Sequence, residues 1–284
     1  MSKFAANLTM LFTELPFLER FAAAREAGFA AVEFLFPYEW PAAELGRLLR
    51  EHGLSQALFN MPPGNWGAGE RGMAAIPGRE AEFRAHLPNV RDYALALGCT
   101  KVHAMSGIVD PTHSLGVRDY ALALGCTKVH AMSGIVDPIH SLSAHRQTLI
   151  ENIRFAADFL AEDGIRVLLE PLNDRDVPGY FLAHQLDALA LVQEIDRPNV
   201  GVQLDLYHAQ IMDGDLTRLI GKLGPAIGHV QIASVPDRHE PDEGEIAYPH
   251  LFKVLAQAGY HDWIGCEYNP RAGTREGLGW LTQQ

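Results

Sequence analysis

The sequence is poor in cysteine and has no long apolar run. Only three of its 284 residues are cysteines, Cys99, Cys126 and Cys266, and no two of them have the spacing of metal ligands. A small, odd number of cysteines argues against a disulfide framework and indicates a reducing compartment. No apolar stretch approaches the ~20 residues of a membrane helix, and the amino terminus has no clear signal-peptide pattern. We therefore expect a cytoplasmic protein with no membrane partner.

Positive charge is also scarce. Lysine and arginine together number 23, against 35 acidic residues, which gives a formal net charge of −12. Such a surface repels phosphate backbones, and no run of basic residues offsets it. We therefore expect no nucleic acid partner. No glycine-rich phosphate loop follows the first apolar strand candidate, which argues against a dinucleotide-binding fold.

A near-identical tandem duplication occupies the middle of the chain. Residues 90–115 and 117–142 match at 25 of 26 positions and differ only at Thr112 and Ile139. Each copy contains the end of a helix, a strand and a loop. A closed eight-stranded barrel does not admit a ninth strand, because strand number, tilt and shear are linked. We predict that one copy supplies a barrel strand and that the other is extruded; the sequence does not choose between them.

Eight short apolar runs alternate with helical patterns when the duplication is counted once. Glycine follows each helical stretch within two residues, where its left-handed conformation ends a helix. This recurrent order predicts an α/β fold of eight βα units, a (β/α)8 TIM barrel that forms a single domain over residues 1–284. The expected strands are Phe4–Met10, Ala31–Leu35, Gln56–Asn60, Lys101–Met105 or its copy Lys128–Met132, Arg166–Pro171, Gly201–Tyr207, Gly228–Ala233 and Trp263–Tyr268. The expected helices are Phe17–Ala27, Ala42–His52, Arg79–Leu97, Ala144–Glu162 and Phe252–Ala258.

Two glutamates stand at the ends of predicted apolar strands. Glu170 follows the run VLL in the fifth strand, and Glu267 follows IGC in the eighth. A carboxylate there loses hydration, which raises its pKa toward the range useful for proton transfer. A single strand-end glutamate is also consistent with an arginine pair or a helix cap. Two of them on converging strand ends favour a catalytic acid–base pair.

Asp205 in QLDLYH and Gln231 in HVQIA add two oxygen-bearing side chains on strands six and seven. With the two glutamates they form a set of the kind that Mg²⁺ and Mn²⁺ prefer. A helix cap at Asp205 and a bond from Gln231 to a neighbouring strand fit the sequence equally well. A divalent-metal site and a structural role therefore both stay open.

Three more side chains are candidates for substrate binding near strands six and seven. His208 follows the sixth strand, and Arg238 and Glu240 lie in the charged loop PDRHEPDEGEI after the seventh. An arginine there can hold a substrate carboxylate through a bidentate contact, although the loop is also consistent with a solvated surface. His103 in the fourth strand is more typical of a structural histidine.

The loop after the third strand, MPPGNWGAGERG, has the glycine and proline content of an ordered loop or lid. Asn65, Trp66 and Glu70 in this loop are candidate substrate contacts. Lids over barrel mouths exclude water from reactive intermediates, whereas the alternative is a plain surface loop.

Several longer motifs carry these residues, among them FAANLTMLFTE, AVEFLFPY, ALFNMPPGNWGAGERG, QLDLYHAQ, GHVQIA, PDRHEPDEGEI and DWIGCEYNPR. Together they resemble the hydroxypyruvate isomerase family of xylose isomerase-like barrels over nearly the whole chain except the extra copy. The opening segment and the PDRHEPDEGEI loop resemble the 2-oxo-tetronate isomerase branch most. The LLEPLND stretch is nearer to the hydroxypyruvate isomerase branch.

The resemblance implies an aldose–ketose type isomerase of a small keto sugar acid, 2-oxo-tetronate or hydroxypyruvate. It implies that Glu170 and Glu267 transfer the proton through an enediol, and that Glu170, Asp205, Gln231 and Glu267 form a divalent-metal position. Sugar epimerases of the superfamily have a histidine where Gln231 stands, and glutamine is a weaker, neutral ligand. The chemistry needs no nicotinamide or flavin. The substrate, the need for metal, and the choice between a monomer and a homo-oligomer stay open.

Two other functions fit parts of the sequence. An endonuclease-IV-like metal nuclease shares the barrel, but it needs several histidines at strand ends and a basic face for DNA, which a net charge of −12 does not favour. The other is a barrel whose activity is impaired by the duplication, because the fourth strand lies next to the strand that carries Glu170.

Overall fold

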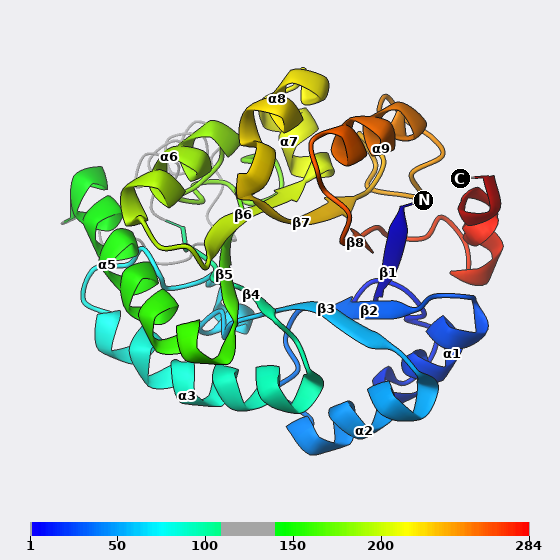
Figure 1. Cartoon of the computed structure of the whole chain (residues 1–284), viewed down its shortest axis with the longest axis horizontal. Helices are drawn as coiled ribbons and strands as arrows, with labels where there is room; N and C mark the ends of the chain where they lie inside the picture. The colour runs from blue at the N-terminus through cyan, green and yellow to red at the C-terminus, as the bar shows by residue number, and fades with distance from the viewer. Residues whose placement is uncertain (1, 109–139, 284) are drawn as a thin grey trace, which may run out of the picture.

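The chain folds into a closed barrel of eight parallel strands, arranged in their sequence order (Figure 1). The structure is a computed structural model that describes residues 2–108 and 140–283. The strands are β1 (Lys3–Asn7), β2 (Ala31–Phe34), β3 (Ser55–Asn60), β4 (Lys101–His103), β5 (Arg166–Leu169), β6 (Val200–Asp205), β7 (Ile227–Ile232) and β8 (Trp263–Cys266). The predicted TIM barrel is confirmed.

Helices surround the barrel on its outer side (Figure 1). They are α1 (Arg20–Glu26), α2 (Ala42–His52), α3 (Glu80–Leu97), α5 (Leu142–Leu160), α6 (Gln185–Ile195), α7 (Leu206–Met212), α8 (Leu216–Leu223) and α9 (Tyr248–Gln257). In α8 the buried residues Leu216, Leu219, Ile220 and Leu223 recur at helical spacing, so that one apolar face packs inward. β6 and β7 are buried along their whole length, as a parallel sheet requires. Within the described ranges, no helix combines the length and apolarity needed to cross a membrane.

The expected strands and helices are present, with bounds shifted by a few residues, but α6, α7 and α8 were not expected. The predicted strand Gly201–Tyr207 ends at Asp205, because the Asp205 carboxylate accepts a 2.8 Å hydrogen bond from the Tyr207 N–H and starts α7 there. α6 ends at Ile195, and the next residue, Asp196, has a positive φ of 51°. No glycine marks this stop, so the glycine rule did not detect it.

The first copy of the duplication supplies the fourth strand. α3 begins before the repeat and continues to Leu97 inside the first copy, which leads into β4. The buried face of α3 extends from Phe83 and Leu87 to Tyr93 across this boundary. Use of the second copy would interrupt that helix. The strand candidate of the second copy, Lys128–Met132, lies outside the described residues, so its extrusion stays a prediction.

Candidate active site

Four oxygen-bearing side chains lie at the carboxyl ends of neighbouring strands. Glu170 directly follows β5, Asp205 ends β6, Gln231 is the penultimate residue of β7, and Glu267 directly follows β8. All four residues are buried. Asp205 and Gln231 are direct partners in the register of β6 and β7. The structure therefore places the four predicted residues on the face where barrel enzymes carry out their chemistry.

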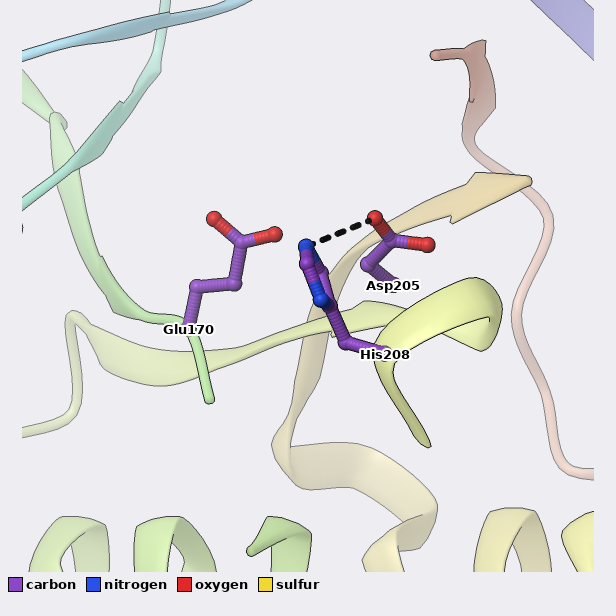
Figure 2. Close-up of side chains that lie close together, drawn as sticks. All are labelled: Glu170, Asp205 and His208. Atoms are coloured by element: carbon purple, nitrogen blue, oxygen red, sulfur yellow. Dashed lines mark ion pairs between the residues drawn. The ribbon is translucent and has the colours of Figure 1, made fainter. Parts of the chain in front are cut away.

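Glu170, Asp205 and His208 form a compact group (Figure 2). Each residue offers one ligand atom, and these three atoms lie within 4.8 Å of one another. His208 is in the first turn of α7, and its Nε2 is 3.5 Å from Asp205 Oδ2. Figure 2 shows the imidazole between the two carboxyl groups, so the predicted substrate residue His208 faces both of them.

Burial controls the protonation of these carboxyl groups. It raises the pKa of Glu267 to about 8 and that of Asp205 to about 6, while the Arg238 guanidinium opposes both shifts. Burial also holds the pKa of Glu170 well above its usual range, and the negative charge of Glu267 adds to the effect. A buried carboxyl that keeps its proton near neutral pH can act as an acid, and an ionised neighbour can act as a base.

Arg238 supplies positive charge inside the site. Its Nη2 donates to Glu267 Oε2 at 2.7 Å and lies 3.5 Å from Asp205 Oδ2. The guanidinium also covers the ring of Tyr207, 4.8 Å from the centroid. Arg238 has a positive φ of 56°, and such strained conformations cluster at functional sites. As a substrate-binding residue, Arg238 would share its guanidinium between Glu267 and the substrate.

Replacing Arg238 with methionine is expected to shift activity to higher pH. The guanidinium lowers the pKa of Glu267, which burial raises, so loss of the guanidinium should raise that pKa further. The limb of the pH profile of kcat/KM that reports Glu267 should move to higher pH. Arg238→Lys keeps the charge and should move the limb less. An unchanged limb in the methionine variant would show that the guanidinium does not act on the pKa of Glu267.

Glu240 is buried and engaged with the C-terminal segment. Its Oε2 accepts a 2.8 Å bond from Arg271 Nε. A Cβ added at Gly277 would lie 2.1 Å from Glu240 Oε1, so the glutamate packs directly against that backbone. These contacts fix the loop after β7, and substrate binding by Glu240 stays a prediction.

The loop after β3 is ordered by the residues predicted to touch substrate. The Asn65 side chain caps a short 3-10 helix, and Glu70 pairs with Arg79 at 2.9 Å. Trp66 is 42% exposed, and the Arg71 guanidinium lies over its ring at 3.8 Å. The described contacts of Asn65 and Glu70 stay within the segment between β3 and α3. Their role in substrate binding, and that of Trp66, stays a prediction.

A buried polar network inside the barrel was missed in the sequence. The Glu33 carboxylate on β2 accepts hydrogen bonds from His229 Nε2 at 2.6 Å and Gln231 Nε2 at 2.7 Å. Asn7 Nδ2 on β1 donates to Glu33 at 3.0 Å and to Glu267 at 3.3 Å. The network therefore extends to one of the two predicted catalytic glutamates. The available signal was a charged or polar residue inside an apolar strand, as in AVEF and GHVQI.

The donor set fits a divalent cation through its carboxylates. Glu170 and Asp205 belong to the compact group, and Glu170 Oε1 is buried with no hydrogen-bond partner among the described residues. An unpaired buried oxygen of this kind is a suitable ligand for a hard cation. Gln231 is less available, because its Oε1 accepts a 2.6 Å bond from Gln203 on β6 while its Nε2 donates to Glu33. Metal binding stays a prediction.

A closed parallel barrel with buried acidic side chains at the carboxyl ends of its strands defines the class of TIM-barrel enzymes. The profile of the xylose isomerase-like TIM barrel family matches residues 21–284. The chain belongs to this family.

Similar proteins narrow the class further. The chain is 50% identical to a 2-oxo-tetronate isomerase of Pectobacterium atrosepticum, over 99% of this chain and 97% of that protein. It is 41% identical to the hydroxypyruvate isomerase of Escherichia coli, over 99% and 98%. A crystal structure from Brucella melitensis, described as an AP endonuclease of family 2, is 56% identical with a TM-score of 0.89, over 100% and 99%. The resemblance to the hydroxypyruvate isomerase family is confirmed.

Proposed function

We propose that this isomerase interconverts a small 2-keto sugar acid and its positional isomer, with 2-oxo-tetronate as the substrate and hydroxypyruvate as the runner-up. The substrate choice is supported by relatives of that name at 50% identity, against 41% for a hydroxypyruvate isomerase. The observation that carries the reaction type is the pair of buried carboxyl groups, Glu170 and Glu267. Burial shifts both toward the pKa range of proton transfer.

The proposed chemistry is an enediol proton transfer. One glutamate, as its carboxylate, removes a proton from the hydroxyl-bearing carbon beside the substrate carbonyl. The electron pair moves onto the carbonyl oxygen and gives an enediolate. The proton of the neighbouring hydroxyl moves to that oxygen, and the other glutamate, as its acid, returns a proton to the former carbonyl carbon, so that the hydroxyl oxygen becomes the new carbonyl. Arg238, bound to Glu267, offsets the negative charge that accumulates in this buried site.

A divalent cation, Mg²⁺ or Mn²⁺, fits this proposal. Glu170, Asp205 and Glu267 would hold it, with Gln231 as a further ligand if it released its bond to Gln203. Such a cation would stabilise the enediolate oxygens as a Lewis acid. No nicotinamide or flavin enters the reaction, because the substrate and the product have the same oxidation state overall.

The test is an NMR assay in D₂O with 2-oxo-tetronate and, separately, hydroxypyruvate, each with and without Mg²⁺ or Mn²⁺. We expect isomer formation, with deuterium entering at the exchanging carbon to the extent that the catalytic proton exchanges with solvent. The substrate that is converted faster shows whether the enzyme acts as a 2-oxo-tetronate isomerase or as a hydroxypyruvate isomerase. A folded chain that turns over neither substrate would contradict the proposal, provided that the duplication is not the cause.

A deletion of residues 113–139 separates these two explanations. It leaves one copy of the duplicated sequence, and all eight strands and the four site residues lie outside it. We expect the deletion variant to fold and to isomerise the same substrate at least as fast as the full chain. Activity in the deletion variant alone would show that the duplication impairs the enzyme. Activity in neither would reject the proposed function.

A nuclease is the second candidate, because the similar Brucella structure is described as an AP endonuclease. The described three-residue ligand group contains one histidine, His208, and His103 Nδ1 lies 3.1 Å from Glu170 Oε2 beside it, whereas a multi-zinc nuclease site uses several histidines as ligands. The net charge of −12 also opposes DNA binding. Cleavage of an abasic-site duplex by the purified chain would favour the nuclease, and the absence of cleavage beside rapid isomerisation would dismiss it.

We place the enzyme in the cytoplasm. Cys99 and Cys266 are buried free thiols, which fits a reducing compartment. A small keto sugar acid is the partner that we propose.

A further inference from the structure

Asn173 is a buried polar residue that the proposed reaction does not yet use. It lies three residues after Glu170 and is fully buried. Its backbone N–H donates to His208 Nδ1 at 3.1 Å, and its side-chain Nδ2 lies 2.6 Å from the same atom. Asn173 therefore contacts Nδ1 of the histidine that lies between Glu170 and Asp205.

The orientation of the Asn173 amide follows from Asp176. The Asp176 N–H donates to Asn173 Oδ1 at 2.8 Å, and Asn173 Nδ2 donates to the Asp176 carboxylate at 3.0 Å. A flipped amide would set its nitrogen against the Asp176 N–H and its oxygen against the carboxylate. The amide nitrogen must therefore be the atom that faces His208.

Two N–H groups consequently point at one nitrogen of the His208 ring. A ring nitrogen that faces two donors presents its lone pair, so Nδ1 carries no proton and the proton of the neutral ring is on Nε2. Nε2 is the atom that lies 3.5 Å from Asp205 Oδ2 and faces Glu170 (Figure 2).

We propose that Asn173 is a positioning residue that fixes His208 as its Nε2–H tautomer, so that the ring is a neutral hydrogen-bond donor to the reacting oxygen of the substrate and not a metal ligand. The donor role rests on the proposed isomerase function. The tautomer rests on the hydrogen bonds alone. Ligation through Nε2 would need the proton on Nδ1, directly against the two N–H groups of Asn173. A metal in this site would therefore be held by carboxylates, although His208 lies in the compact group.

The decisive measurement is the tautomer of His208 in the full chain. Long-range ¹H–¹⁵N NMR of the histidine-labelled protein distinguishes a protonated from an unprotonated ring nitrogen, and the spectrum of His208→Gln assigns the signal. We expect a protonated Nε2 and an unprotonated Nδ1, both unchanged on addition of Mg²⁺. A protonated Nδ1, or loss of the Nε2 proton when Mg²⁺ is added, would overturn the inference.

Asn173→Asp tests the positioning role. The variant replaces the donor that faces Nδ1 with a carboxylate oxygen, which favours a proton on Nδ1. We expect the His208 signals to change to the Nδ1–H or doubly protonated form, and kcat for the keto acid to fall at least ~10-fold with a smaller change in KM. Asn173→Ala leaves the backbone donor in place, so the Nε2–H tautomer should persist with a smaller loss of kcat. An unchanged tautomer in Asn173→Asp would contradict the positioning role.

Asn199→Asp is the matched control. Asn199 also donates its amide hydrogens inside the fold, to the carbonyl oxygens of Ala157 and Ile165, away from the four site residues. It should lower stability and leave both the tautomer and the kcat of the folded enzyme unchanged. The NMR result does not depend on turnover. If the wild-type chain isomerises neither keto acid, the proposed function fails while the tautomer stands or falls on its own spectrum.

Discussion

Replacing Glu170 or Glu267 with glutamine is expected to lower kcat by about 10³-fold or more and to leave the barrel folded. Each substitution keeps the size of the side chain and removes the group that accepts or returns the proton. Both groups are buried, and the raised pKa of each favours the neutral acid, so a neutral amide is a close structural match. The measurement is kcat with 2-oxo-tetronate, together with the circular dichroism spectrum of each variant.

The Glu267→Gln substitution should also change how the free energy of unfolding depends on pH. Burial raises the pKa of Glu267 to about 8 in the folded protein, whereas an unfolded glutamate has a pKa of ~4.3. The folded protein binds more protons than the unfolded chain between these values, so its stability is highest below that window and falls as pH rises through it. The free energy of unfolding of Glu267→Gln should fall less over this range than that of the wild type.

Glu151→Gln is the control for these variants. Glu151 lies on the exposed side of α5, where it accepts a bond from Gln147. Its replacement should leave kcat and the pH dependence of stability unchanged. The acid–base assignment would be wrong if either site variant kept more than a tenth of the wild-type kcat.

Gly265→Ala is expected to destabilise the protein by about 3 kcal/mol and to lower its Tm by roughly 5–10 °C. A Cβ at Gly265 would lie 2.3 Å from both carboxylate oxygens of Glu33. The carboxylate would have to move, and its hydrogen bonds to His229, Gln231 and Asn7 would be lost or distorted. Buried groups left without partners add to the cost of the steric overlap. Urea unfolding and thermal melts measure the change.

Gly221→Ala is the matched glycine control. Gly221 lies inside α8, and an added Cβ meets nothing within 4 Å. Alanine favours a helix over glycine, so this variant should be equal to or up to about 1 kcal/mol more stable than the wild type. Equal stabilities for the two alanine variants would show that the close contact between Gly265 and Glu33 has little energetic effect.

The sequence predicted the barrel and the positions of the carboxylates well, because both follow from local patterns. Apolar runs separated by helices and glycines indicate βα units, and the strand-end residues Glu170 and Glu267 follow their apolar runs directly. The carboxyl ends of barrel strands meet on one face whatever the details of packing. It was therefore possible to predict that these residues lie close together, although the distances between them could not be predicted.

The partners of these residues were not predictable in the same way. Glu33 and His229 are 196 positions apart and meet only because the barrel closes. Arg238 was expected in the site, but its bond to Glu267 depends on a left-handed backbone turn that no local rule indicates. The contact of Asn173 with His208 depends on how the chain turns after β5. Each of these contacts is tertiary, and periodicity carries no information about it.

The duplication lengthens the sequence between two elements of the barrel. Residues 104–141 lie between β4 and α5 in the sequence, and both elements are complete. The entropic cost of closing a flexible loop grows slowly with its length, by about 0.6 kcal/mol for each doubling. This part of the sequence follows the carboxyl end of β4, where His103 Nδ1 lies 3.1 Å from Glu170 Oε2. It is therefore a suitable point for inserting a reporter domain that senses occupancy of the active site.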